Sequence, residues 1–187
     1  MPGPVITIGG PHGTGKSTYA RALARALNLR YVCAGELFRE LAKERKMSLE
    51  EFSAIAARDP AIDRIIDERT KAEAQKGGAV IDAQLGAWMV KDLANLKLLL
   101  TAPDNIRFKR IADRDRTTLD IARKETVTRE SIQRQRYKEY YGINTDDVTI
   151  YDLKIDTSLY PIEKTKQVII DSVRKALVRI NPTKATP

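Results

Sequence analysis

The strongest constraint on this chain is one glycine-rich segment, Gly10-Pro11-His12-Gly13-Thr14-Gly15-Lys16-Ser17. It matches the pattern G-x-x-x-x-G-K-[ST] at every fixed position. An apolar run at residues 5–8 precedes it, and apolar residues at helical spacing follow it. Glycines let the backbone curl until successive N–H groups point at one anion, and a helix N-terminus adds partial positive charge. The segment therefore predicts a buried strand, a phosphate-binding loop and a helix over about residues 16–28.

The side chains of this loop are expected to share the work of holding ATP. Lys16 would reach the β and γ phosphates, Ser17 would take one position on Mg²⁺, and Thr18 would contact the α phosphate. His12 occupies a variable position, where an ordinary loop role is favoured over a phosphate contact. The predicted ATP-binding set is Gly10, Pro11, His12, Gly13, Thr14, Gly15, Lys16, Ser17 and Thr18.

Any metal ion must be held by oxygen ligands. The chain contains one histidine and one cysteine, Cys33, so it has no zinc-binding constellation and no internal disulfide. Asp82 ends a predicted strand, where a carboxylate beside a phosphate loop commonly holds the magnesium water shell. The alternative is an aspartate that only caps the strand. We expect a magnesium site built from Ser17 and Asp82.

Strand-like and helix-like patterns alternate along the chain. Five apolar runs predict strands, at residues 5–8, 31–33, 79–82, 96–100 and 151–155. The intervening segments show helical spacing or helix-capping signals, and Gly142 ends the longest of them. This alternation predicts an α/β fold with a parallel sheet and helices on both faces. A length of 187 residues suits one domain, expected over residues 1–180, followed by a flexible tail at 181–187.

The charge of the chain indicates a polyanionic partner. The formal net charge is +8, and residues 105–138 alone hold eleven basic and five acidic residues. Nucleotide phosphates or a nucleic acid would suit such a surface, and the nucleic acid is the less favoured. No apolar run is long enough to span a membrane, and the N-terminus lacks the basic region of a signal peptide. We therefore expect a cytoplasmic protein with no membrane partner, monomeric or weakly homo-oligomeric.

Several segments outside the loop, taken with it, resemble the archaeal-type cytidylate kinases, a branch of the nucleoside monophosphate kinases. The resemblance extends to about Ser158. It rests on AGELFRELA (34–42), MSLEEF (47–52), DPAID (59–63), LGAWM (85–89), RQRY (134–137), YGI (141–143) and IYDL (150–153).

The resemblance implies a three-layer P-loop NTPase fold with a five-stranded parallel sheet. It also implies a helical segment for the nucleoside monophosphate at about residues 35–76 and a small helical lid at about 117–141. The implied reaction transfers a phosphoryl group from ATP to CMP or dCMP. Two alternatives remain open: the same fold acting on another acceptor (another nucleotide, a small metabolite or an RNA end), or an ATP-binding module without catalysis.

Three arginines of the predicted lid are candidates for catalysis. Arg129, Arg134 and Arg136 lie at i, i+5 and i+7, on or near one face of a helix. A loose phosphoryl-transfer transition state needs positive charge more than covalent chemistry, and mobile arginines supply it. The alternative is a solvated basic surface. That alternative is favoured for Arg107, Lys109, Arg110 and Arg116, although Arg110 or Arg114 is also a candidate for the ATP site.

The acceptor site is predicted from the resemblance. The arginine that matches Arg39, one helical turn after Gly35, grips the acceptor phosphate in the resembling kinases. Asp63, with Asp67 one turn further, is a candidate for reading base or ribose, and equally a favourable charge near a helix N-terminus. The family usually has a second phosphate-binding arginine where this chain has Gln84, which weakens the identity of the acceptor. The rings of Tyr31 and Trp88 suit base stacking or core packing, and the tyrosines at 137, 140 and 141 suit anchoring of the lid helix.

Overall fold

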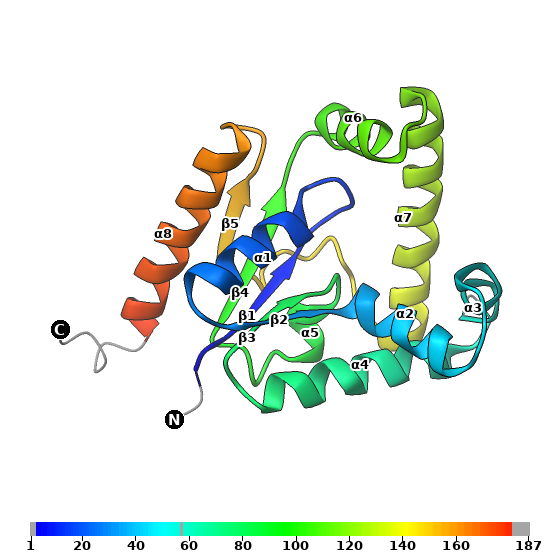
Figure 1. Cartoon of the computed structure of the whole chain (residues 1–187), viewed down its shortest axis with the longest axis horizontal. Helices are drawn as coiled ribbons and strands as arrows, with labels where there is room; N and C mark the ends of the chain where they lie inside the picture. The colour runs from blue at the N-terminus through cyan, green and yellow to red at the C-terminus, as the bar shows by residue number, and fades with distance from the viewer. Residues whose placement is uncertain (1–2, 57, 181–187) are drawn as a thin grey trace.

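Five parallel strands form one sheet in the computed structural model, which describes residues 3–56 and 58–180 (Figure 1). The order across the sheet is β2-β3-β1-β4-β5. All five predicted strands are confirmed, and no end differs from its prediction by more than two residues. Their bounds are β1 Val5–Gly9, β2 Arg30–Cys33, β3 Ala79–Asp82, β4 Leu96–Thr101 and β5 Leu153–Asp156.

Helices connect the strands, and local capping signals set where several of them begin or end. Ser48 and Glu51 form the predicted capping box, in which the Ser48 backbone N–H donates to Glu51 and the Glu51 N–H donates to the Ser48 hydroxyl. Gly142 takes the left-handed conformation (φ 65°) that ends the longest helix. The bounds are α1 Lys16–Ala26, α2 Ala34–Glu44, α3 Leu49–Ala56, α4 Pro60–Gln75, α5 Gly86–Met89, α6 Asp104–Asp115, α7 Leu119–Tyr141 and α8 Ile162–Ile180.

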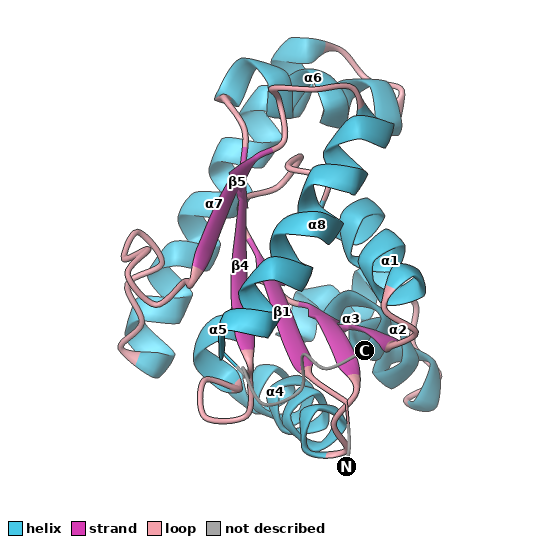
Figure 2. Cartoon of the chain, turned by 90° about the vertical axis from the view of Figure 1, so that its left-hand side faces the viewer, coloured by secondary structure: helices cyan, strands magenta, loops and turns pink. Residues whose placement is uncertain are grey.

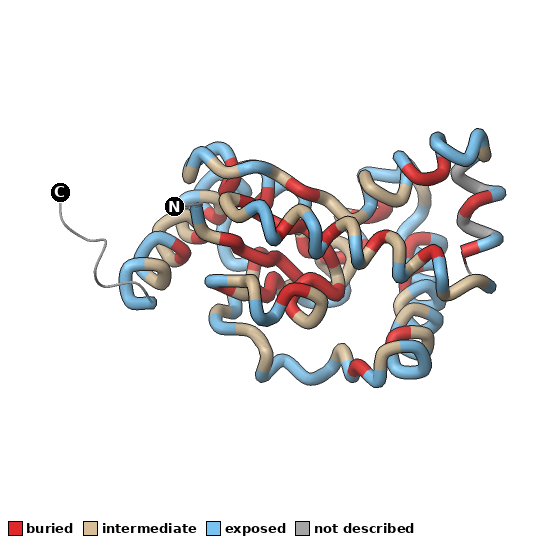
Figure 3. Tube along the Cα trace, turned by 90° about the horizontal axis from the view of Figure 1, so that it is seen from below, coloured by how far each residue is buried: buried red, intermediate tan, exposed pale blue. Residues whose placement is uncertain are grey.

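The sheet is covered on both faces, as the alternation of strands and helices predicts (Figure 2). Alternate residues of β1 point to opposite faces. Ile6 and Ile8 pack with α1 and α8, whereas Val5 packs on the other face with residues of α4 and α5. Buried residues accordingly concentrate in the central strands and on the inner sides of these helices (Figure 3). None of the described helices combines the length and apolar composition needed to cross a membrane.

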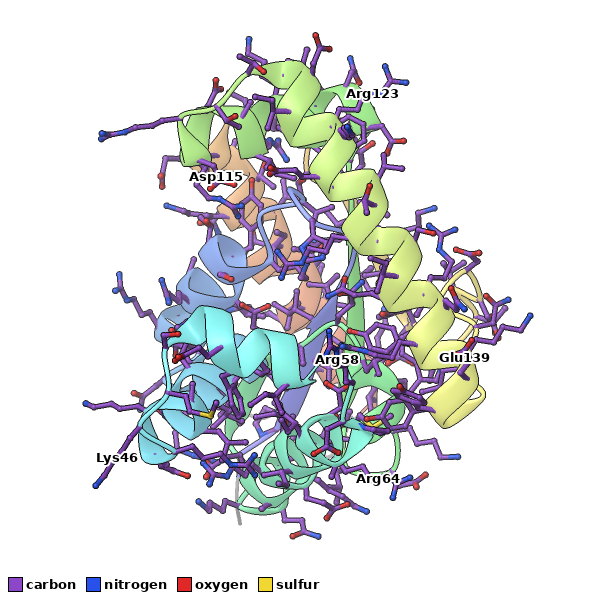
Figure 4. All side chains as sticks on the ribbon, turned by 90° about the vertical axis from the view of Figure 1, so that its right-hand side faces the viewer. Lys46, Arg58, Arg64, Asp115, Arg123 and Glu139 are labelled. Atoms are coloured by element: carbon purple, nitrogen blue, oxygen red, sulfur yellow. The ribbon has the colours of Figure 1, made fainter. Side chains whose placement is uncertain are left out.

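A second group of helices packs beside the sheet and includes the first half of α4, whose last turns cover the sheet. α2, α3 and α4 pack around their own apolar cluster, which includes Phe52 and Ile62. The long helix α7 runs opposite them, with Arg123 near its first turn and Glu139 near its last (Figure 4). The predicted acceptor segment, residues 35–76, contains α3, α4 and most of α2, and the predicted lid, residues 117–141, contains α7; both roles stay predictions. The predicted tail, residues 181–187, lies outside the described residues.

Candidate active site

The phosphate loop connects β1 to α1 and has left-handed glycines where the chain is most crowded. Gly10 (φ 136°) and Gly13 (φ 79°) adopt conformations that other residues rarely take. A Cβ on Gly10 would lie 2.2 Å from the Leu100 carbonyl oxygen, and one on Gly13 would lie 2.6 Å from that of Arg107. The curl is reinforced by the Thr14 hydroxyl, which donates to the Pro11 carbonyl at 2.9 Å. The glycines are therefore required both by backbone conformation and by space.

Lys16 lies across the loop. Its Nζ donates to the carbonyl oxygens of Gly10 at 2.7 Å and Pro11 at 3.0 Å. Burial lowers the pKa of this ammonium group, and the nearby Asp82 carboxylate partly opposes the shift. A cation held this way among loop carbonyls is ready to exchange them for phosphate oxygens.

Asp82 ends β3 beside the loop. The parallel register pairs it with Ile8 of β1, and its side chain is only 5% exposed. The Tyr31 hydroxyl donates to Asp82 Oδ2 at 2.9 Å, and burial raises the pKa of that tyrosine. Ser17 and Thr18 lie in the first turn of α1 and are exposed. Tyr31 thus positions a carboxylate, which favours the structural role over base stacking.

Glu130 of α7 fastens the lid helix to the phosphate loop. Its Oε1 accepts from the backbone N–H of His12 at 3.0 Å and from Arg107 Nη1 at 2.8 Å. Arg107 also donates to the His12 carbonyl at 2.7 Å and to Asp104 at 2.6 Å. The favoured solvated role of Arg107 is therefore wrong: the residue is 4% exposed because α6 packs against the loop. Arg110 is likewise turned inward.

His12 has a structural partner on α7. Its Nε2 lies 2.9 Å from Gln133 Oε1. Burial, the largest effect, lowers the pKa of His12 to about 4, so the ring is neutral near pH 7. His12 thus joins the loop to α7, and its role toward phosphate stays a prediction.

A cavity of about 1060 Å³, here called the outer cavity, lies between α2–α4 and α7. Its walls hold the predicted acceptor residues Gly35, Arg39 and Asp63. Arg129 and Arg136 line it from α7, together with Lys124. The same wall includes Gln133, which contacts the phosphate loop. The cavity therefore adjoins the loop and carries more positive than negative side chains, as a site for a second phosphate requires.

The structure separates Arg134 from the other two arginines of the predicted trio. Arg134 Nη1 lies 3.5 Å from Asp146 Oδ1, and the side chain lines a different cavity beside Gly10 and Gln84. A residue five positions along a helix lies about 140° round the axis from the first, so Arg129 and Arg134 face different ways. Trp88 lines that same cavity and packs edge-on against Tyr151, with ring centroids 5.7 Å apart.

A smaller cavity of about 90 Å³, here called the inner cavity, continues from the outer one. The two share Asp63 and Tyr137 among their lining residues. Gln84 lines the inner cavity but not the outer one, which holds the arginine cluster of Arg39, Arg129 and Arg136. Tyr137 is buried, and the Tyr141 hydroxyl donates to Asp67 Oδ2 at 2.5 Å, in keeping with the predicted anchoring of the lid helix.

Two functional contacts were not foreseen from the sequence. Glu130 belongs to no recognisable motif, and only its position in the fold shows that it links α7 to the phosphate loop. Thr157 follows β5, and its hydroxyl donates to the Thr14 carbonyl at 3.0 Å while accepting from Arg110 at 2.9 Å. Its place after the last strand, at the carboxyl edge of the sheet, was the available signal.

Comparisons with known proteins give one consistent picture. The family model described as "AAA domain" matches residues 6–138. A cytidylate kinase of Staphylothermus marinus is 50% identical over 92% of this chain and 98% of its own length. One from Aeropyrum pernix is 48% identical over 90% and 98%, respectively. The crystal structure of shikimate kinase from Bacteroides thetaiotaomicron has a TM-score of 0.63 at 12% identity, covering 93% of this chain and 98% of that one, which supports the fold alone.

Proposed function

The chain belongs to the family of archaeal cytidylate kinases, and on that premise we propose that it transfers the γ-phosphoryl group of ATP to CMP or dCMP. One structural observation supports the proposal. α7 joins the phosphate loop to the positively charged outer cavity, because Gln133 lines that cavity and contacts His12 of the loop, and Glu130 one turn earlier also contacts His12. A donor in the loop and an acceptor in the cavity would thus meet at α7.

The loop would hold the donor. Its backbone N–H groups face the phosphates, and Lys16 exchanges its loop carbonyls for β and γ oxygens as ATP enters. The N-terminus of α1 adds favourable partial charge at the same place. These groups neutralise the charge that builds up on the leaving ADP.

The residues present suit a magnesium ion. Ser17 and Asp82 offer hydroxyl and carboxylate oxygens, the hard ligands that Mg²⁺ takes, and Tyr31 already orients the carboxylate. Among the described residues no group of three or more histidine, cysteine, aspartate or glutamate side chains could hold a metal ion by itself. The two oxygen donors of Ser17 and Asp82 suit an ion that substrate phosphates also hold. When bound, Mg²⁺ would neutralise charge on the transferring group.

The acceptor phosphate would lie among Arg39, Arg129 and Arg136 in the outer cavity. An oxygen of this phosphate attacks the γ phosphorus as the bond to the ADP oxygen breaks, so the products are ADP and a nucleoside diphosphate. The attacking oxygen is already anionic, so the step needs positioning and positive charge rather than a general base. The cluster supplies that charge without an arginine at Gln84.

A coupled assay of ADP release tests the proposal. Purified protein with ATP and Mg²⁺ is given CMP, dCMP, UMP, AMP, GMP, shikimate or a 5′-hydroxyl RNA in separate reactions. The proposal predicts rapid release that depends on CMP or dCMP, with CDP or dCDP as the second product. Slow release that is equal with and without every acceptor would overturn it and favour a non-catalytic ATP-binding module.

A further inference from the structure

Two carboxylates from neighbouring turns of α4 face the inner cavity. Asp63 and Asp67 both line it, and neither lies in a fully solvated position. Burial raises the pKa of both groups, that of Asp67 to about 6. Holding two acidic groups this close in a partly buried site costs folding free energy, so their placement calls for a reason beyond packing.

The two carboxylates have different partners. Asp63 Oδ2 lies 3.1 Å from Arg136 Nε, so its charge is already opposed by a cation. Asp67 has only the Tyr141 hydroxyl, which donates to Oδ2. Among the described residues, no group donates a hydrogen bond to Asp67 Oδ1. One oxygen of Asp67 is thus left without a protein partner in a residue that lines the cavity.

The other walls of the inner cavity are mostly apolar or aromatic. They include Ile66, Leu85, Met89 and the ring of Tyr137. Such walls suit the faces of a flat ring. A nucleotide with its phosphate among the outer arginines would place its base here.

We propose that Asp67, positioned by Tyr141, accepts a hydrogen bond from the exocyclic amino group of the acceptor base and so selects cytosine over uracil. This inference rests on the proposed function, because it concerns the acceptor of that reaction. An ionised carboxylate only accepts hydrogen bonds. The cytosine amino group donates one, whereas the uracil O4 would bring a second acceptor against Asp67 and leave both unpaired.

A substrate analogue tests the proposal on the unaltered protein. Pyrimidin-2-one ribonucleoside 5′-monophosphate carries hydrogen in place of the amino group of CMP. Losing one hydrogen bond to a charged acceptor is expected to lower kcat/KM by about 10- to 100-fold relative to CMP. UMP is expected to be worse still, because its O4 faces the carboxylate. Equal kcat/KM for CMP and the analogue would overturn the proposal.

Variants give an independent reading. Asp67→Asn can turn its amide nitrogen toward the uracil O4, so the ratio of kcat/KM for CMP to that for UMP should fall by about 10- to 100-fold. Tyr141→Phe removes only the positioning group, so KM for CMP should rise while KM for ATP stays unchanged. Asp171→Asn, the same change on the distant helix α8, should leave all these values unchanged.

The outcomes separate this inference from the proposed function. Wild-type protein that transfers to CMP, with a CMP-to-UMP ratio unaltered in folded Asp67→Asn, overturns the inference and leaves the function intact. Wild-type protein that phosphorylates no nucleoside monophosphate overturns both. If Asp67→Asn does not fold, the analogue comparison on wild-type protein decides alone.

Discussion

Glu130 on α7 accepts a hydrogen bond from the backbone amide of His12, 3.0 Å away, so the helix that lines the outer cavity is tied directly to the phosphate loop. The contact is supported by Arg107, which donates to both partners. α7 is therefore held near its middle by Glu130 and at its last turn by the Tyr141–Asp67 hydrogen bond, while Ala122 near its start packs against Ile111 and Ala112 of α6.

Glu130→Gln is expected to lower the free energy of unfolding by about 1–3 kcal/mol, because the buried Arg107 would lose the more buried of its two carboxylate partners. Chemical denaturation at pH 7 measures this. Glu139→Gln, on the same helix but exposed, serves as the control and should change stability by less than about 0.5 kcal/mol. Equal free energies of unfolding for the two variants would contradict a role for Glu130 in linking α7 to the phosphate loop.

Lys16→Ala is expected to lower kcat by at least about 100-fold, because the γ phosphate loses its closest cation. Thermal stability should be retained, since burial of this ammonium group is unfavourable in the empty loop. Steady-state kinetics and a thermal melt check both points. Lys175→Ala, exposed on α8, is the matched control. A Lys16→Ala enzyme with wild-type kcat would contradict the assignment of the loop.

The three lid arginines are expected to differ. Arg129→Gln and Arg136→Gln should each lower kcat by at least about 100-fold, because both side chains line the outer cavity. Arg134→Gln should have less than about a 10-fold effect, since Arg134 does not line the outer cavity and its pair with Asp146 is exposed. Steady-state assays at saturating ATP and CMP measure this. Equal losses in all three would restore the grouping predicted from the sequence.

Asp67 gives a pH-dependent prediction. Burial raises its pKa from 3.8 to about 6, with Asp63 and Glu68 adding to the shift and Arg136 and the Tyr141 hydroxyl opposing it. The folded protein therefore binds this proton more tightly than the unfolded chain does, and stability from this group falls as pH rises from about 4 to 6.

Asp67→Asn cannot ionise, but its amide oxygen still accepts from Tyr141. The variant should be more stable than wild type at pH 8, by about 1–3 kcal/mol, and the difference should shrink toward zero near pH 4. Denaturation curves across this range measure it. A variant that is less stable than wild type at pH 8 would show that the carboxylate contributes to stability rather than burdening it.

Local sequence information was enough for the loop, the strands and most helices. The glycines at positions 10 and 13 indicate a curled backbone by residue type alone. The capping box joins Ser48 and Glu51, which are three residues apart, so its pattern can be recognised in the sequence. The short helix α5, Gly86–Met89, was not predicted because four residues give no helical period. The alternation of strands and helices predicted that the strands are parallel, but not their order across the sheet.

Contacts between distant segments were the part that the sequence could not supply. Arg107 was assigned to the solvated face of a basic helix, yet α6 buries it against the loop. The pairings of Glu130 with His12 and of Tyr141 with Asp67 join residues 118 and 74 positions apart. No periodicity or motif carries such distances, so only the folded arrangement shows which charges meet.

The most direct test uses a pentaphosphate-bridged adenosine–cytidine dinucleotide, which spans the loop and the outer cavity in one molecule. If the phosphate loop and the outer cavity meet at α7, this compound should inhibit competitively against both ATP and CMP. One molecule should bind per chain. It should also bind more tightly than either nucleotide alone, because the second half binds intramolecularly. Competition with ATP but not with CMP would contradict the account.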